Sequence, residues 1–147
     1  MMGTIMTSNL LIRLAKDADR DAVFYLARDL ATSFEVDRQE FDSVFDRIQR
    51  EDSIWLGVAE SNAEVIGYLL GLDHLTFYAN GRVAWIEEVV VRQDWRRRGV
   101  GQALTVAFES WTANRGAKLI ALATRRAAKF YQSLGYEESA TYFRKLV

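Results

Sequence analysis

The sequence predicts an α/β (α+β) fold, in which a β-sheet carries helices on its faces. The chain has 147 residues, of which 50% are hydrophobic and 27% charged, as is typical of one domain with its own core. Apolar residues recur at helical spacing in some segments and form short β-rich runs in others. No repeat, low-complexity tract or linker divides the sequence. We therefore expect a loosely ordered N-terminus over residues 1–9 and a single domain over residues 10–147.

The chain begins with a predicted strand and two predicted helices. Residues 10–14 are a short apolar strand, and Asp17 and Asp19 follow where a helix cap and its first turn favour negative charge. Apolar residues spaced three and four apart then predict one helix around residues 22–30 and a second around residues 41–48.

The middle of the chain changes to β-type patterns. Residues 54–60 and 65–72 are β-rich runs separated by a short polar turn, which indicates a hairpin. Residues 73–81 are expected to form a loop that contains two aromatic side chains. Residues 83–92 then form the strongest predicted strand, and residues 96–101 are a basic turn that contains glycine.

The last third of the chain alternates helices and strands. The basic turn leads into an amphipathic helix that ends near Gly116, and a strand is predicted over residues 119–123. A short helix follows and ends at Gly135, a residue type that suits a helix C-terminus. The tail, residues 136–147, is expected to form one or two final strands.

Several classes of site are excluded by composition. The chain has no Cys, so disulfide scaffolds, Cys-ligated metals and thiol nucleophiles are ruled out. Its single histidine, His74, rules out a site built from several histidines, and we expect no metal. The longest apolar run, residues 65–72, is far shorter than the ~18 residues that span a membrane. We therefore expect a cytoplasmic protein with no membrane partner.

Charge is distributed unevenly along the chain. Residues 1–74 contain 7 basic and 14 acidic residues, whereas residues 75–147 contain 12 basic and 6 acidic residues. A basic C-terminal half favours an anionic ligand there, and an acidic N-terminal half would attract a cationic substrate. Two differently charged solvated faces are the alternative interpretation.

The predicted strand, turn and helix over residues 86–111 contain the clearest candidate for a ligand-binding site. The first turn of a helix leaves N–H groups unpaired at the positive end of the helix dipole, and glycines allow an anion to approach closely. The arginines of the turn add donors that suit phosphate, so a phosphate or pyrophosphate is predicted over residues 97–102. The turn is not a Walker loop and has only two of the three glycines of a dinucleotide fingerprint. A basic loop that simply begins a helix is the alternative.

Two motifs resemble the GNAT family of N-acetyltransferases. Residues 87–101, EEVVVRQDWRRRGVG, are similar to its central motif, and the pattern Arg/Gln-x-x-Gly-x-Gly/Ala is filled by Arg96, Gly99 and Gly101. The second motif, Ala-x-x-Phe-Tyr-x-x-x-Gly-Phe/Tyr, is matched by Ala127, Phe130, Tyr131, Gly135 and Tyr136. The resemblance extends from about residue 10 to the C-terminus, with Gln93 where the family often has Pro and Thr124 where it often has Asn.

This resemblance implies a mixed, mostly antiparallel sheet that is splayed between its fourth and fifth strands. It also implies transfer of an acetyl group from acetyl-CoA, the co-substrate, to a primary amine by direct attack in a ternary complex. The cofactor pyrophosphate would lie on the amides of residues 97–102 and its pantetheine arm along residues 89–91. The implied cofactor-binding residues are Val89, Val90, Val91, Arg96, Arg97, Arg98, Gly99, Val100, Gly101, Gln102, Thr124, Ala127 and Tyr131. The ribose 3′-phosphate could be reached by Arg125, Arg126 and Lys129, which could equally form a solvated helix face.

The resemblance further implies three catalytic groups. A carboxylate must take a proton from the incoming ammonium, and Glu87 and Glu88 are the candidates. The two point to opposite faces of a strand unless a bulge intervenes, and the resemblance favours Glu87. Val89 is the candidate N–H donor to the thioester carbonyl. Tyr131 would protonate the departing CoA thiolate, with core packing as the alternative.

The acceptor is expected to be a small-molecule or peptide amine. Such folds build the acceptor pocket from the N-terminal helix pair and, here, from residues 73–81 and Trp85, with His74, Phe77 and Tyr78 as further lining candidates. A structural role is the alternative for each of these side chains, and a homodimer is left open. Two other functions remain: a non-catalytic acyl-CoA sensor domain, and a nucleic-acid-binding module that uses the arginine cluster. The net charge of −1 argues against the latter, so we expect no nucleic-acid partner.

Overall fold

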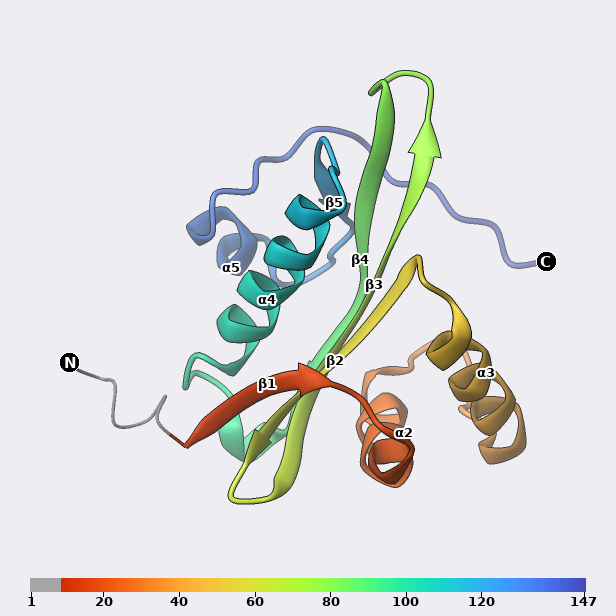
Figure 1. Cartoon of the computed structure of the whole chain (residues 1–147), viewed down its shortest axis with the longest axis vertical. Helices are drawn as coiled ribbons and strands as arrows, with labels where there is room; N and C mark the ends of the chain where they lie inside the picture. Colours follow the sequence, from red (N-terminus) through yellow and green to blue (C-terminus); the bar gives the residue numbers. More distant parts are fainter. Residues whose placement is uncertain (1–8) are drawn as a thin grey trace.

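Five strands form one sheet in the order β1–β2–β3–β4–β5 (Figure 1). The computed structural model describes residues 9–147, so residues 1–8 of the predicted loose N-terminus lie outside the described part. Three pairings are antiparallel and only β4–β5 is parallel, so the sheet is mixed and mostly antiparallel, as the resemblance implied. The strands are β1 (Leu10–Leu14), β2 (Ile54–Ser61), β3 (Glu64–Thr76), β4 (Gly81–Val91) and β5 (Ile120–Leu122).

Helices cover both faces of this sheet (Figure 1). Helices α2 and α3 pack on one face, where Phe45 is 2% exposed, and α4 packs on the other, where Phe108 is fully buried. The predicted fold class is therefore confirmed. The helices are α2 (Arg20–Leu30), α3 (Arg38–Arg50), α4 (Val100–Asn114) and α5 (Ala128–Ser133), with short 3₁₀ turns η1 (Asp17–Asp19) and η2 (Gln93–Trp95).

The sheet opens between β4 and β5. The two strands are in register only over Ala84–Ile120, Trp85–Ala121 and Ile86–Leu122. Strand β4 continues to Val91, but within residues 9–147 it has no strand partner on this side after Ile86. This divergence is the splay that the resemblance implied between the fourth and fifth strands.

A β-bulge lies at the point where the sheet opens. Leu70 of β3 pairs with Glu88, whereas the next residue, Gly71, pairs with Ile86. Glu87 is therefore an extra residue that has no partner on β3. A bulge of this kind shifts the alternation of side chains along the strand by one position.

The bulge directs both carboxylates toward the α2–α3 layer. Before it, Ile86 belongs to the core under α4, so simple alternation places Glu87 on the opposite face. After it, Val90 belongs to the core under α2 and α3, and Glu88, two residues earlier, shares its face. The two neighbouring glutamates thus share one face, which the sequence pattern allowed only if a bulge was present.

The prediction of a loop over residues 73–81 is wrong, because most of this segment extends the β3–β4 hairpin. The strands pair as far as Thr76 and Gly81, and only residues 77–80 turn. Asp73 suggested a loop, but its buried carboxylate is paired with Arg82 and Arg115. Because its charge is compensated, Asp73 can occupy a buried position in a strand.

One further expectation is corrected at the C-terminal end of the chain. Residues 136–147 contain no strand, because β-type residues form one only where a neighbouring strand pairs with them. Near the other end, Asp17 and Asp19 do lie in the first turn of a helix, η1, where the Asp19 carboxylate accepts from the Lys16 N–H at 2.7 Å and from Arg13 of β1 at 2.8 Å. The ion pair with Arg13 lowers the pKa of Asp19, so the acidic start of the helix anchors β1.

Candidate active site

The turn between β4 and α4 presents unpaired N–H groups. Gly99 has φ of 83°, a left-handed conformation that glycine adopts without strain, and it directly precedes α4. The first bond of the helix is donated by the Ala103 N–H to the Gly99 carbonyl at 3.0 Å. The amides of Val100, Gly101 and Gln102 therefore have no acceptor within the helix. Together with the helix dipole, they form the kind of helix N-terminus that binds anions.

The three arginines of this turn have different surroundings. Arg96 donates from Nε to the carbonyl of Val91 at 3.0 Å, which ties the turn to the end of β4. The guanidinium of Arg98 lies 4.3 Å from the centre of the Trp95 ring, in a cation–π contact. Arg97 is exposed and has φ of 63°. None of the three has a carboxylate partner within residues 9–147, so their charge is available to an anionic ligand.

The open edge of β4 presents backbone groups to the gap beside β5. The Arg92 N–H donates to the Ile66 carbonyl of β3 at 2.8 Å, so it faces β3. Backbone groups alternate in direction along a strand, so those of Val91 and Val89 face the gap. The bond from Arg96 to the Val91 carbonyl agrees with this direction. The amide of Val89, the predicted donor to the thioester, therefore lies on the open edge.

Tyr131 lies on α5 and is half-buried. Its ring packs edge-on against Phe130 and Tyr136, with centroid distances of 4.9 Å and 5.7 Å. The Tyr136 hydroxyl donates to Glu109 at 2.8 Å, which ties the end of α5 to α4. Burial raises the pKa of Tyr131, so its hydroxyl stays protonated at neutral pH. Within residues 9–147 this hydroxyl has no hydrogen-bond partner, and the tyrosine is both a packing residue and an available proton donor.

Neighbouring side chains complete the α5 end of the site. The Thr124 hydroxyl accepts from the Ala127 N–H at 3.0 Å and so shapes the turn before α5. Arg125, Arg126 and Lys129 are exposed, and no acidic partner pairs with them in the part of the chain that the structure describes. They add positive charge to the same half of the molecule as the arginine turn.

Glu88 is held by a tyrosine from the adjacent strand. The hydroxyl of Tyr68, a side chain only 1% exposed, donates to Glu88 Oε1 at 2.6 Å. Burial raises the pKa of Glu88, the Tyr68 hydrogen bond opposes this rise, and the charge of Glu87 adds to it; the net shift is upward. Burial and the charge of Glu88 raise the pKa of Tyr68, so the phenol remains a donor. A carboxylate with a raised pKa is a stronger base and suits proton transfer.

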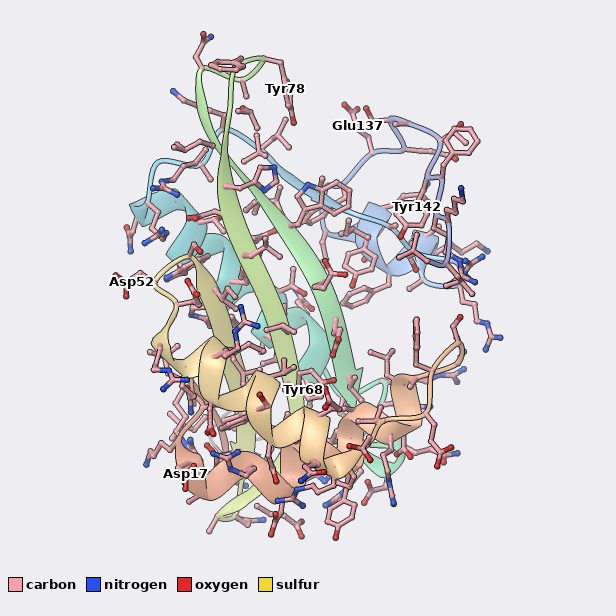
Figure 2. All side chains as sticks on the ribbon, turned by 90° about the vertical axis from the view of Figure 1, so that its right-hand side faces the viewer. Asp17, Asp52, Tyr68, Tyr78, Glu137 and Tyr142 are labelled. Atoms are coloured by element: carbon pink, nitrogen blue, oxygen red, sulfur yellow. The ribbon has the colours of Figure 1, made fainter. Side chains whose placement is uncertain are left out.

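A cavity of about 540 Å³ lies between the sheet and the α2–α3 pair. On the sheet side it is lined by Leu56, Tyr68, Leu70 and Glu88, and Arg144 of the C-terminal tail also contributes. Figure 2 looks onto the face of the sheet that α2 and α3 cover, where Tyr68 is labelled. Glu88 therefore connects this cavity to the open part of β4, whereas Glu87 is more exposed and does not line it.

The predicted acceptor pocket is supported only in part. The helix pair lines the cavity, but His74, Phe77, Tyr78 and Trp85 do not. Phe77 and Tyr78 are exposed at the tip of the β3–β4 hairpin, far from Tyr68 (Figure 2). Tyr68 itself was missed, because its contact with Glu88 depends on the register between β3 and β4 and leaves no mark in either strand alone.

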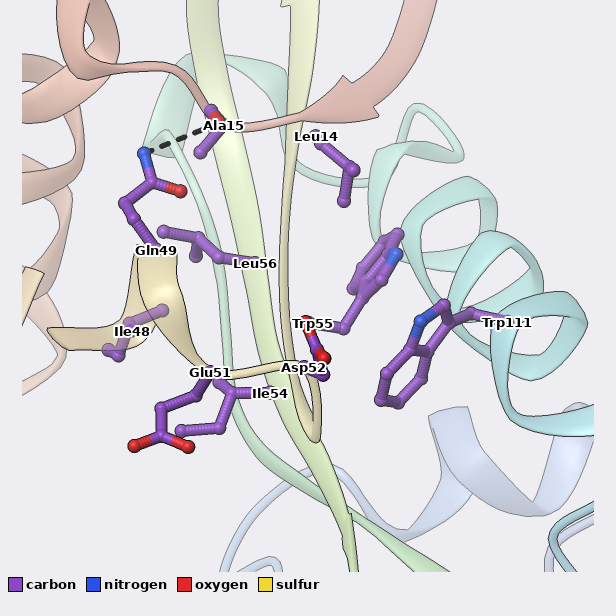
Figure 3. Close-up of a pocket in the computed structure, with 10 residues that line it drawn as sticks. All are labelled: Leu14, Ala15, Ile48, Gln49, Glu51, Asp52, Ile54, Trp55, Leu56 and Trp111. Atoms are coloured by element: carbon purple, nitrogen blue, oxygen red, sulfur yellow. Dashed lines mark hydrogen bonds between the residues drawn. The ribbon is translucent and has the colours of Figure 1, made fainter. Parts of the chain in front are cut away.

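A second cavity of about 230 Å³ is lined by Trp55, Trp111 and the segment that joins α3 to β2 (Figure 3). None of the predicted catalytic or cofactor-binding residues lines it. No helix of the described part is long and apolar enough to cross a membrane. Residues 9–147 also contain no group of three His, Asp or Glu side chains placed to hold a metal ion. The cytoplasmic location and the homodimer stay predictions.

Strand β4 diverges from its parallel neighbour β5 and leads into the exposed N-terminus of α4, and comparison with known proteins identifies the family that has this fold. A profile of the acetyltransferase (GNAT) family matches residues 20–136. The chain therefore belongs to the GNAT family of acetyltransferases. The resemblance seen in the sequence is thus confirmed, as is the assignment to this class of enzymes.

Individual relatives share modest sequence identity with the chain. Aminoglycoside N(6′)-acetyltransferase type 1 of Stenotrophomonas maltophilia is 28% identical over 103 residues, 64% of this chain and 67% of the relative. N-acetyltransferase YhfO of Bacillus subtilis is 28% identical over 100 residues, 65% of this chain and 66% of the relative. The chain thus spans about two thirds of the length of these relatives. The solved aminoglycoside N-acetyltransferase AAC(6′)-Iy in complex with CoA has the same fold, with a TM-score of 0.81, 22% identity and coverage of 92% and 94% of the two chains.

Proposed function

We propose that the chain transfers an acetyl group from acetyl-CoA to a primary amine by direct attack in a ternary complex. The observation that supports this most is the position of the bulge in β4. It places a half-buried carboxylate, Glu88, beside an acceptor-sized cavity, and the next residue, Val89, presents its amide to the gap between β4 and β5. An acid–base group and a carbonyl-binding amide therefore meet at one point of the strand.

The residues present fit coenzyme A. Its pyrophosphate would accept hydrogen bonds from the free amides of residues 97–102, and Arg97 and Arg98 would supply compensating charge. Gly99 has no neighbouring atom within 4 Å of an added Cβ, so the backbone there is open to a bulky anion. The open edge of residues 89–91 would hold the pantetheine amides as an added strand would, through the backbone groups of Val89 and Val91. When bound, the cofactor supplies the acetyl thioester.

We assign the proton transfers to Glu88 and Tyr131. Glu88 would accept one proton of the substrate ammonium, and the freed nitrogen lone pair forms the new C–N bond as the C–S bond breaks. The nitrogen then releases its second proton to solvent, which leaves the neutral amide. The Val89 amide would donate to the carbonyl oxygen while negative charge develops there. Tyr131 would donate its proton to the departing sulfur. Glu88 replaces Glu87 as the preferred base because it lines the cavity and is fixed by Tyr68.

A non-catalytic acyl-CoA sensor is the competing function. A sensor needs the cofactor site but has no use for a half-buried carboxylate with a raised pKa beside the cavity under α2 and α3. The hydrogen-bonded pair of Tyr68 and Glu88 therefore favours catalysis.

Thiol release from acetyl-CoA tests the proposal. The purified chain is incubated with acetyl-CoA and polyamines, amino acids, peptides, amino sugars or arylalkylamines, and free CoA is measured against a no-amine control. We expect amine-dependent release with at least one class. Saturable CoA binding in calorimetry without release from any class would favour the sensor, and no binding at millimolar CoA would exclude both functions.

A further inference from the structure

We propose that the acceptor is a primary amine with a mainly apolar body, of the arylalkylamine or alkylamine type, bound in the cavity between α2, α3 and the sheet. This inference rests on the proposed function and specifies its substrate class. It differs from the polyhydroxylated amino sugars that the names of several similar proteins suggest.

The interior of the cavity is apolar. The apolar side chains of its walls come from α2, α3, β2 and β3, and they are buried or half-buried. They are Val23, Phe41, Phe45, Ile48, Leu56 and Leu70. A volume of about 540 Å³ lies within the range of small-molecule sites and has room for an aromatic ring on a short chain.

Polar groups are separated by depth in this cavity. In the interior, the only polar side chains among the lining residues are Tyr68 and Glu88, and they already bond to each other. The other polar side chains belong to the exposed α2–α3 loop, to the first turn of α3 and to the tail. Some of these are also occupied, since Asp37 accepts from the Glu40 N–H at 2.9 Å and Arg144 donates to Ser33 at 3.0 Å.

This separation selects against hydroxyl-rich acceptors. A sugar ring in the cavity would place several hydroxyl groups against hydrocarbon, where each loses its hydrogen bonds to water without replacement. An apolar body loses nothing on entering and gains by leaving water. An apolar pocket discriminates against a single added hydroxyl by about 100-fold, and a sugar ring carries several hydroxyl groups, so we expect a clear preference for the apolar body.

Charge fixes the orientation of the amine. Glu88 is the one carboxylate in the interior, and it can pair with a single ammonium group. Glu35 and Glu40 are exposed at the mouth, where they attract a cation without entering the cavity. The ammonium would therefore enter first and reach Glu88 beside Val89, while the apolar body fills the space under α3.

The experiment compares two acceptors of similar size. We measure kcat/KM for 2-phenylethylamine and for glucosamine at saturating acetyl-CoA, and we expect the former to be higher by at least about 100-fold. An equal or higher value for glucosamine overturns the inference but leaves the proposed function intact. If neither amine is acetylated but another amine from the panel is, the outcome depends on that amine: an apolar body supports the inference and a hydroxylated body overturns it. If no amine is acetylated, the proposed function fails instead.

A matched pair of variants locates the effect. Val44 of α3 lines the cavity and is 51% exposed, and Val106 of α4 is 50% exposed on the other side of the sheet. Val44→Asn should lower kcat/KM for 2-phenylethylamine about tenfold, because it places an amide in the apolar wall. Val106→Asn should leave it unchanged, and the KM for acetyl-CoA should be the same in both. Equal effects of the two variants would contradict the assignment of this cavity.

Discussion

The gap side of β4 and the α2–α3 side of β4 are assembled in different ways. On the gap side, one contiguous stretch, residues 89–102, supplies the open strand edge, the arginines and the free amides. On the other side, the cavity collects residues from α2, α3, β2, β3, β4 and the C-terminal tail. A site formed by one contiguous stretch can bind a ligand that stays the same, such as a cofactor. A site collected from many elements can be altered by substituting single residues. The difference places cofactor recognition on the first side and substrate choice on the second.

The largest expected effect separates the two carboxylates at the bulge. Glu88→Gln should lower kcat at least about 100-fold, because it removes the general base, whereas Glu87→Gln should change it less than about threefold. Steady-state thiol release with each variant measures this, and CoA affinity by calorimetry serves as the control for an intact cofactor site. A larger loss in Glu87→Gln than in Glu88→Gln would reverse our assignment.

The buried carboxylate of Asp73 should affect stability rather than turnover. The Asp73 side chain has no solvent exposure and pairs with Arg82 and Arg115, away from both binding sides. Asp73→Asn should lower the free energy of unfolding by about 2 kcal/mol, since it breaks a buried ion pair, while kcat of the folded protein stays unchanged.

Urea unfolding followed by tryptophan fluorescence measures the effect of Asp73→Asn. The matched variant Asp94→Asn breaks an exposed pair with Arg92 and should cost less than about 0.5 kcal/mol. A selective loss of kcat in Asp73→Asn would mean that this carboxylate also acts in the reaction.

The gap side can be tested at Gly101. An added Cβ would lie 3.4 Å from Phe130, and the further atoms of a valine would cover the free amides of the first turn. Gly101→Val should therefore weaken CoA binding about tenfold or more by calorimetry. Ala113→Val, in the exposed last turn of the same helix, is the control and should leave the dissociation constant unchanged. Equal affinities for all three proteins would remove the helix N-terminus from the cofactor site.

The smallest expected effect is a displaced pH profile. The Tyr68 hydrogen bond lowers the pKa of Glu88, so Tyr68→Phe should raise that pKa further. Less of the carboxylate is then charged at a given pH, and the acid limb of kcat/KM moves to higher pH. We expect a loss of a few-fold at neutral pH that recovers as the pH rises. A uniform loss at every pH would mean that Tyr68 has a packing role alone.

The gap side could be predicted from the sequence because its residues are neighbours in the chain. Arg96, Gly99 and Gly101 form a motif, and the preceding β-rich run predicts the strand that carries it. The strand–helix order and the helix positions followed from hydrophobic periodicity for the same reason. Local patterns therefore sufficed for the fold class and for the turn.

The acceptor side could not be predicted in the same way. The contact between Tyr68 and Glu88 depends on a one-residue bulge, and a bulge leaves the β-rich pattern of a strand unchanged. The loop expected over residues 73–81 begins at Asp73, but the charge of this side chain is compensated by Arg82 and Arg115, and ion pairs of this kind are not visible in the sequence. Residues 136–147 were expected to form strands, but the β propensity of a segment does not show whether a partner strand is available.

Amide hydrogen exchange with and without CoA tests most directly whether the open edge of β4 and the start of α4 hold the cofactor. We predict that saturating CoA slows exchange at least about tenfold at Val89, Val91, Gly101 and Gln102, whose N–H groups have no acceptor in the described part of the chain. The Val90 amide faces β3 and should change little. Saturated binding that leaves Val89 and Val91 unprotected would contradict the account.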